Sequence, residues 1–82
     1  MNKTFLVYIG SANYIIPLFR SIKKLKFRGI ESDRLYKLIN QDGKTLATAG
    51  TSELTVDMTD VEWFYFAITY GSSSSAYVTF LE

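Results

Sequence analysis

The sequence has 82 residues, a formal net charge of +1, and neither cysteine nor histidine. Without these residue types the chain lacks a disulfide framework, a thiolate nucleophile, the usual general base near neutral pH and the usual zinc ligands. We therefore expect a single domain over residues 1–82 that is not an enzyme and holds no cofactor or metal.

The composition is rich in apolar residues for so short a chain. Hydrophobic residues make up 48% of the sequence and aromatic residues 16%. A domain of this size buries only about 60–65% of the surface that its unfolded chain exposes. Some apolar surface is therefore expected to meet another chain, in a homo-oligomer or on a protein partner.

The first predicted element is a strand over "KTFLVYIG", from Lys3 to Gly10. Its two faces are both apolar, with Phe5, Val7 and Ile9 on one and Leu6 and Tyr8 on the other. Two apolar faces predict a central strand, or a strand that another chain covers. The segment "ANYII" predicts a second short strand, which Pro17 ends because proline cannot donate to a ladder.

The longest uncharged stretch runs from Thr4 to Phe19. It is shorter than the roughly 20 apolar residues that a membrane helix needs. We expect no membrane insertion and a soluble protein, either cytoplasmic or virion-associated.

Residues 17–30 fit two structures. As a helix, the segment would begin with Pro17 in the first turn and end near Gly29. As a strand from about Lys23 to Ile30, it alternates cationic side chains with Leu25 and Phe27. The strand is favoured, with a short helix near residues 17–25 as an option in front of it.

The clearest local signal is a hairpin in "RLYKLINQDGKTLATAG", residues 34–50. The pair Asp42-Gly43 supplies the positive φ that tight hairpin turns need. A helix over Asp33–Asn40, capped by Ser32, is the alternative. The next segment, "ELTVDM", alternates as a strand with one solvated face, with Leu54, Val56 and Met58 pointing inward.

The segment "VEWFYFAITY", residues 61–70, predicts the most aromatic strand. Phe64, Phe66 and Ile68 share one face and are expected in the core. The other face carries Trp63 and Tyr65, which are typical of interface anchors and of sugar-stacking platforms. The alternative is that a second sheet or a helix covers this face. The candidate partner-binding residues are Trp63, Tyr65 and Tyr70.

After this strand the chain has Gly71 and four serines, Ser72–Ser75. We expect these serines to form only the loop of a hairpin that pairs residues 61–70 with residues 76–81.

Charge is unevenly distributed along the chain. Residues 1–41 hold eight Lys or Arg against two Asp or Glu (+6), and residues 42–82 hold one against six (−5). The two halves are expected to attract each other within one fold, or head to tail between chains. The basic surface is expected at Lys23, Lys24, Lys26 and Arg28. Alternating cations are typical of an edge strand protected from aggregation, and single-stranded nucleic acid is the functional alternative.

Seven or eight short strands separated by turns predict an all-β fold, a small antiparallel β-sandwich or partly open barrel of about seven strands. The segments "LYKLINQDGKTLATAGTSELTVDM", "WFYFAITYG" and "AYVTFL", between Leu35 and Leu81, resemble the later strands of Ig-like β-sandwich modules. That resemblance favours an Ig-like sandwich. It also implies an accessory, attachment or assembly part of a surface or virion.

These observations lead to one main hypothesis for function. The chain is expected to be a structural or interaction module that self-associates or docks on a protein through aromatic strand faces. The alternatives are a carbohydrate-binding module using Trp63 and Tyr65, a binder of single-stranded nucleic acid, and a small viral inhibitor protein.

Overall fold

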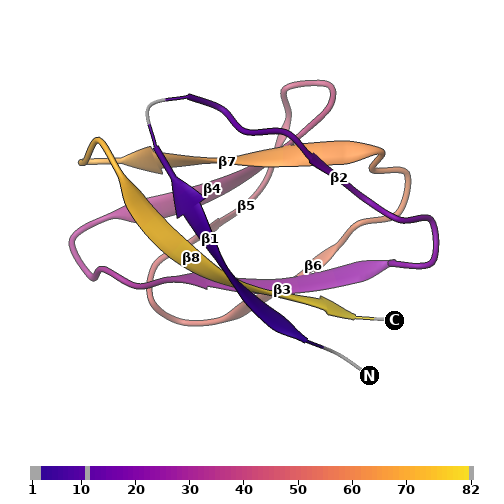
Figure 1. Ribbon diagram of the computed structural model, residues 1–82, viewed down its shortest axis with the longest axis horizontal. Helices are drawn as coiled ribbons and strands as arrows, with labels where there is room; N and C mark the ends of the chain where they lie inside the picture. Colours follow the sequence, from indigo (N-terminus) through magenta and orange to yellow (C-terminus); the bar gives the residue numbers. More distant parts are fainter. Residues whose placement is uncertain (1–2, 11, 82) are drawn as a thin grey trace.

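The computed structural model describes residues 3–10 and 12–81 and contains no helix in this part. Eight strands form there: β1 (Thr4–Ile9), β2 (Ile16–Pro17), β3 (Lys24–Gly29), β4 (Leu35–Asn40), β5 (Thr45–Ala49), β6 (Leu54–Asp57), β7 (Trp63–Thr69) and β8 (Ser74–Leu81). They build two antiparallel sheets, sheet A in the order β1-β8-β3-β6 and sheet B in the order β2-β7-β4-β5. The two sheets pack face to face (Figure 1), which confirms the predicted all-β sandwich.

The strand order is that of an eight-stranded jelly roll. The pairs β4/β5, β3/β6, β2/β7 and β1/β8 are nested, as in one long hairpin that has been rolled up. Alternate pairs fall into opposite sheets. In an Ig-like sandwich the first two strands are neighbours in one sheet, whereas here β1 and β2 belong to different sheets. The sandwich prediction is therefore confirmed, while the strand order differs from the Ig-like one.

The core lies between the inner faces of the two sheets. Phe27 of β3 and Phe66 of β7 meet across it with ring centroids 5.3 Å apart. Phe64 packs against Phe66 at 5.6 Å in an edge-to-face arrangement. Both were expected in the core, and both are buried. Besides Phe27 and Phe64, the largest side chains with exposed fractions below 2% are Tyr36, Leu25, Leu38, Met58 and Val78.

The short helix near residues 17–25 is not formed. Pro17 pairs with Trp63 in the two-residue strand β2, at the edge of sheet B where its missing N–H costs no ladder bond. A turn follows, in which the Ile22 N–H donates to the Phe19 carbonyl at 3.0 Å. The predicted strand after it is confirmed as β3, because the period-two pattern buries Leu25 and Phe27 completely.

The predicted hairpin is confirmed as β4–β5, and the alternative helix over Asp33–Asn40 is wrong. Alternation in "LYKLIN" buries Tyr36 and Leu38 in the core. Gly43 has a φ of +78° and donates its N–H to the Asn40 carbonyl. The Asn40 side-chain oxygen also accepts from the N–H groups of Asp42 and Lys44, each at 3.0 Å, so one residue organises the whole turn.

The hairpin expected around the serines is wrong. Strands β7 and β8 lie in different sheets and do not pair, so the chain crosses the end of the sandwich between them (Figure 1). Strand β8 already begins at Ser74, which is buried and whose Oγ lies 2.5 Å from the Tyr36 hydroxyl. The same hydroxyl accepts the Glu31 N–H at 3.2 Å. This buried hydroxyl pair makes Ser74 part of the core packing rather than of a loop.

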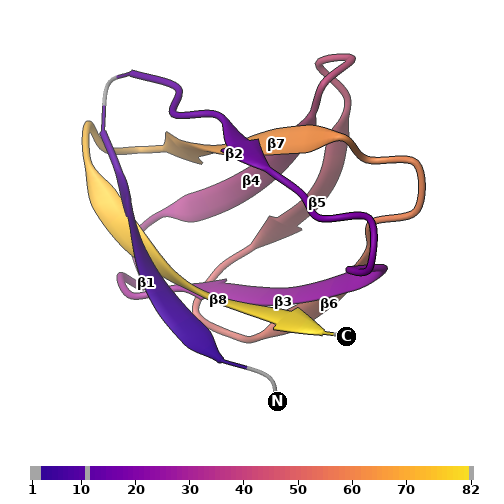
Figure 2. The ribbon, with the colours of Figure 1, turned by 45° about the vertical axis from the view of Figure 1, so that its right-hand side comes forward.

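Strand β1 is an edge strand, not a central one. It pairs with β8 along its whole length and has no other strand partner among the described residues. Strand β2 is the edge of sheet B on the same side of the sandwich, as Figures 1 and 2 show. On the opposite side β5 and β6, which follow each other along the chain, lie closer together than β1 and β2 do. We call the side of β1 and β2 the open side. Since the described residues form no helix, they include none long and apolar enough to cross a membrane.

Candidate functional site: the open side of the sandwich

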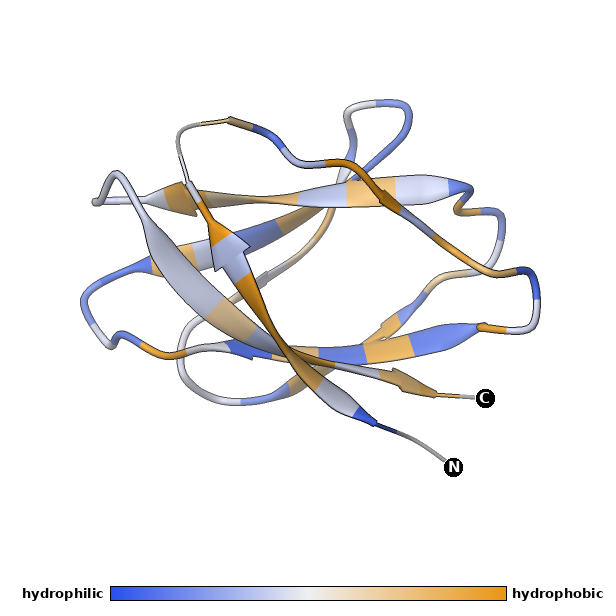
Figure 3. Cartoon of the chain, in the orientation of Figure 1, coloured by the Kyte–Doolittle hydropathy of each residue, from blue (hydrophilic) through white to orange (hydrophobic). Residues whose placement is uncertain are grey.

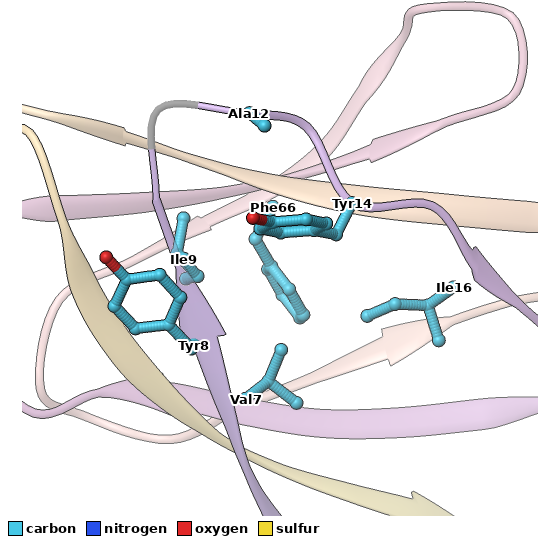
Figure 4. Close-up of a pocket in the computed structure, with 7 residues that line it drawn as sticks. All are labelled: Val7, Tyr8, Ile9, Ala12, Tyr14, Ile16 and Phe66. Atoms are coloured by element: carbon cyan, nitrogen blue, oxygen red, sulfur yellow. The ribbon is translucent and has the colours of Figure 1, made fainter.

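The open side is the surface formed by β1, β2 and residues 12–19, and it contains two apolar hollows. In the first, of about 140 Å³, Val7 and Ile9 of β1 face Ile16 of β2 with the Phe66 ring between them (Figure 4). The remaining lining residues are Tyr8, Ala12 and Tyr14. The second hollow, of about 290 Å³, is lined by Phe5, Ile16, Pro17, Phe19, Ile22 and Phe80. Ile16 lines both, so the two hollows adjoin along the gap between the sheets.

Exposed apolar side chains concentrate on the open side. Among the described residues, eleven large hydrophobic side chains are exposed, and six of them lie between residues 5 and 19. These six are Phe5, Leu6, Tyr8, Tyr14, Ile15 and Phe19, and Phe19 is 80% exposed. Figure 3 shows the hydrophobic colours of β1 and of the segment around β2 at the front of the molecule. Exposed patches of this kind mark sites of contact with other molecules.

The open side also presents a free hydrogen-bonding edge. The outward N–H and C=O groups of β1 have no strand partner in the described part of the chain. Strand β2 offers no comparable edge, because it has two residues and one of them is Pro17. Coverage by another chain was one of the alternatives predicted for residues 3–10. The candidate binding residues, however, were placed at Trp63, Tyr65 and Tyr70 instead. One further signal was present in the printed sequence. The whole stretch from Thr4 to Phe19 lacks a charged residue. In the structure most apolar residues of this stretch are exposed rather than buried.

Trp63 and Tyr65, two of the predicted partner-binding residues, lie together on the outer face of sheet B. In the sheet register Trp63 is opposite Pro17, and Tyr65 is opposite Ile39. Both side chains are half-buried by these neighbours. The expectation that a second sheet or helix covers them is wrong for the described residues, since sheet A packs on the other face of β7. Carbohydrate stacking on this pair stays a prediction.

Tyr70, the third predicted partner-binding residue, is separate from the other two. It follows the end of β7, has a φ of +67° and is 80% exposed. Tyr70 lies seven positions after Trp63 along the chain, which corresponds to about 23 Å at the usual rise per strand residue. Tyr70 and Trp63 therefore cannot contact one sugar ring together.

The predicted basic surface is largely assembled. Lys24, Lys26 and Arg28 share the outer face of sheet A, and Lys23 directly precedes β3. Strand β3 lies between β8 and β6, so the interpretation of these cations as protection of a sheet edge is wrong. The Arg28 guanidinium carbon lies 4.5 Å from the centroid of the Tyr77 ring, a stacked cation–π geometry that the sequence did not reveal.

Acidic side chains of β6 and its flanks partly neutralise this basic surface. Lys26 Nζ lies 3.8 Å from Glu53 Oε1. The hydroxyl and then the backbone N–H of Thr59 hold the pKa of Asp57 below its usual range, and the charge of Lys24 adds to the effect. The expected attraction between the basic and acidic halves of the chain thus occurs within the fold, at the β3–β6 pair.

Neither the described side chains nor similarity to known proteins indicates a particular activity. Among residues 3–10 and 12–81, no three acidic side chains come together as a set of metal ligands. No protein-family model, curated protein or solved structure matches this chain. The open side of the sandwich is the feature on which a functional argument can be built.

Proposed function

We propose that this chain is a non-enzymatic assembly module that works by associating with copies of itself. The observation that supports the proposal is the open side, with its two apolar hollows and six exposed large hydrophobic side chains. Burying such side chains against another protein is favourable by about 25 cal/mol for each Å² of apolar area. Acidic side chains of β6 and its flank partly neutralise the basic surface of β3, so burial of this apolar area is expected to be the main driving force for association.

The strand order agrees with such a role by analogy. Jelly rolls of eight strands include the domains of viral capsids, which assemble, and the domains of lectins, which bind sugars. An analogy at the level of the fold supports a hypothesis without choosing between these uses. An assembly or accessory role of the virion or surface type is our prediction for the setting of this module.

Self-association is expected to depend on concentration and to persist at high salt. Light scattering coupled to gel filtration should show a species of twice the chain mass or more as concentration rises into the millimolar range. Because the contact is apolar, molar sodium chloride should preserve or strengthen it, whereas contacts between charged surfaces would weaken. A strict monomer under all these conditions would contradict the proposal.

The outer face of sheet A supports a second candidate function, the binding of single-stranded nucleic acid. Arg28 stacked on Tyr77 lies beside Lys26 on one side, and Tyr8 of the neighbouring strand β1 is 60% exposed. Basic side chains that alternate with exposed aromatic rings are the means by which small β folds bind single strands.

The second candidate function predicts how oligonucleotide affinity changes with salt and with three substitutions. Oligonucleotide affinity should fall as salt rises and should weaken on Lys24→Ala or Lys26→Ala, with a smaller salt dependence in each variant. Glu53→Gln should strengthen binding, because it releases Lys26 from its acidic neighbour. Fluorescence anisotropy with a labelled oligonucleotide measures the affinity of each variant. An affinity that is unchanged in both Lys24→Ala and Lys26→Ala would exclude this function.

A further inference from the structure

We infer that β1 pairs antiparallel with β1 of a second copy, so that the two copies of sheet A join into one continuous sheet of eight strands. This inference rests on the proposed self-association and specifies its partner and its geometry. It follows from the free edges of the sandwich, from the charge of the open side and from the size of that side.

Strand β1 is the edge best suited to accept another strand. It has six residues and no charged side chain between Thr4 and Ile9. At the far edge of sheet A, β6 has four residues, ends at Asp57 and is preceded by Glu53. Charges on an edge strand oppose the addition of another strand, and a long uncharged edge favours it. Strand β2 is excluded by its length and by Pro17. The fourth edge, β5 of sheet B, is also uncharged, but its pairing with β4 is interrupted by a register shift and it carries no exposed large hydrophobic side chain.

The occupant is a second copy because the surface is compatible with itself. In a two-fold contact each side chain faces the same patch on the partner, so a charged patch would repel its own copy. The stretch from Thr4 to Phe19 has no charged residue and meets itself without that penalty.

The area of the open side also suits a dimer. Figure 1 looks along the shortest axis of the molecule onto this side, and the two axes across the view measure 33 and 26 Å. This outline belongs to the whole molecule and is an upper limit for the area of the open side, and it leaves room for the roughly 800 Å² that each partner buries in a standard interface.

Pairing of the two β1 strands also covers the rest of the open side. Antiparallel neighbours in one sheet are related by a two-fold axis perpendicular to the sheet, which keeps the inner face on the same side in both copies. Sheet B of one copy then lies beside sheet B of the other, with β2 opposite β2. Tyr14, Ile15 and Phe19 become buried, and both hollows are closed by the partner.

Geometry also limits the register of the pair. Directly opposite residues of an antiparallel pair point to the same face of the sheet. A symmetric pairing must therefore be centred on a residue rather than between two residues. Two registers pair five residues on each strand: one is centred on Leu6 and pairs Thr4 with Tyr8, and the other is centred on Val7 and pairs Phe5 with Ile9.

The test is a charge placed on the β1 edge. Leu6→Lys and Tyr8→Lys alter side chains that are 59% and 60% exposed, so each variant should fold, as circular dichroism will check. Leu6→Lys should raise the dimer dissociation constant by at least about tenfold, because its two added cations are directly opposite in the register centred on Leu6 and diagonal in the register centred on Val7. Tyr8→Lys brings its two cations close together only in the register centred on Val7, and in that register it should raise the constant by a similar factor. The matched control is Leu35→Lys, at a residue 41% exposed on β4 of sheet B, which should change it by less than about twofold.

Hydrogen exchange measured on the full chain supplies an independent readout. The amides of alternate β1 residues should be protected in the dimer and exchange freely in Leu6→Lys and on dilution to monomer. If the dimer dissociation constant is unchanged in both lysine variants, or rises in Leu35→Lys instead, the β1 pairing is overturned and self-association stands. A wild-type chain that stays monomeric overturns both.

Discussion

Replacing Phe27 by alanine is expected to lower the free energy of unfolding by about 3–5 kcal/mol, the usual cost of removing a buried phenylalanine. Phe27 is completely buried, lies in the central strand β3 and contacts Phe66 across the sandwich at 5.3 Å. A domain of 82 residues is stable by only about 4–12 kcal/mol. The variant should therefore unfold at a far lower urea concentration than the wild type, or fail to fold at all.

The matched controls separate the loss of core packing from the loss of an aromatic ring as such. Tyr70→Ala removes a ring that is 80% exposed and should change the free energy of unfolding by less than about 0.5 kcal/mol. Phe27→Leu keeps most of the buried volume and should cost less than about 1.5 kcal/mol. Urea titrations followed by Trp63 fluorescence measure all three, and equal midpoints for Phe27→Ala and Tyr70→Ala would contradict this account of the core.

Most of the strands could be predicted from the sequence because their signals are local. Period-two alternation identifies β3 at Leu25 and Phe27, and the pair Asp42-Gly43 identifies the β4–β5 turn. Sheet membership could not be predicted in this way. The chain leaves β7 and enters β8 through a short serine-rich segment that looks like a hairpin loop, yet the two strands join different sheets. Only the nested pairing of the whole chain decides this, and no local pattern encodes it.

For the candidate site, too, local features could be predicted from the sequence and their tertiary setting could not. The sequence singled out Trp63 and Tyr65, because consecutive aromatics are conspicuous, and the structure leaves them half-buried on the outer face of sheet B. The residues of β1 were interpreted as a central strand or as a strand that another chain covers, because apolar side chains on both faces usually mean burial on both faces. Tertiary structure puts β1 at an edge instead, where the same apolar pattern becomes an exposed surface. The pattern predicts an apolar strand but does not say whether its own chain or another one covers it.

Replacing Gly29 by alanine is expected to cost about 3 kcal/mol or more, at the upper end of the range for overpacking. Gly29 lies at the end of β3, and a Cβ atom placed there would overlap the ring of Tyr36, which crosses from sheet B. The ring cannot move aside easily, because it is fully buried and its hydroxyl is bonded to Ser74 Oγ and to the Glu31 N–H. Gly50→Ala is the matched control, since a Cβ there has open space, and its effect should stay within about 1 kcal/mol.

A double-mutant cycle tests whether the Tyr36 ring itself causes the cost of Gly29→Ala. In a Tyr36→Leu background the ring is gone, so adding Gly29→Ala should cost at least about 1 kcal/mol less than it does in the wild type. In a Tyr36→Phe background the ring remains and only the hydroxyl is lost, so the cost of Gly29→Ala should stay near its wild-type value. If the cost were the same in all three backgrounds, it would arise from the backbone of β3 instead. Overlap with the Tyr36 ring would then not be the reason why position 29 requires glycine.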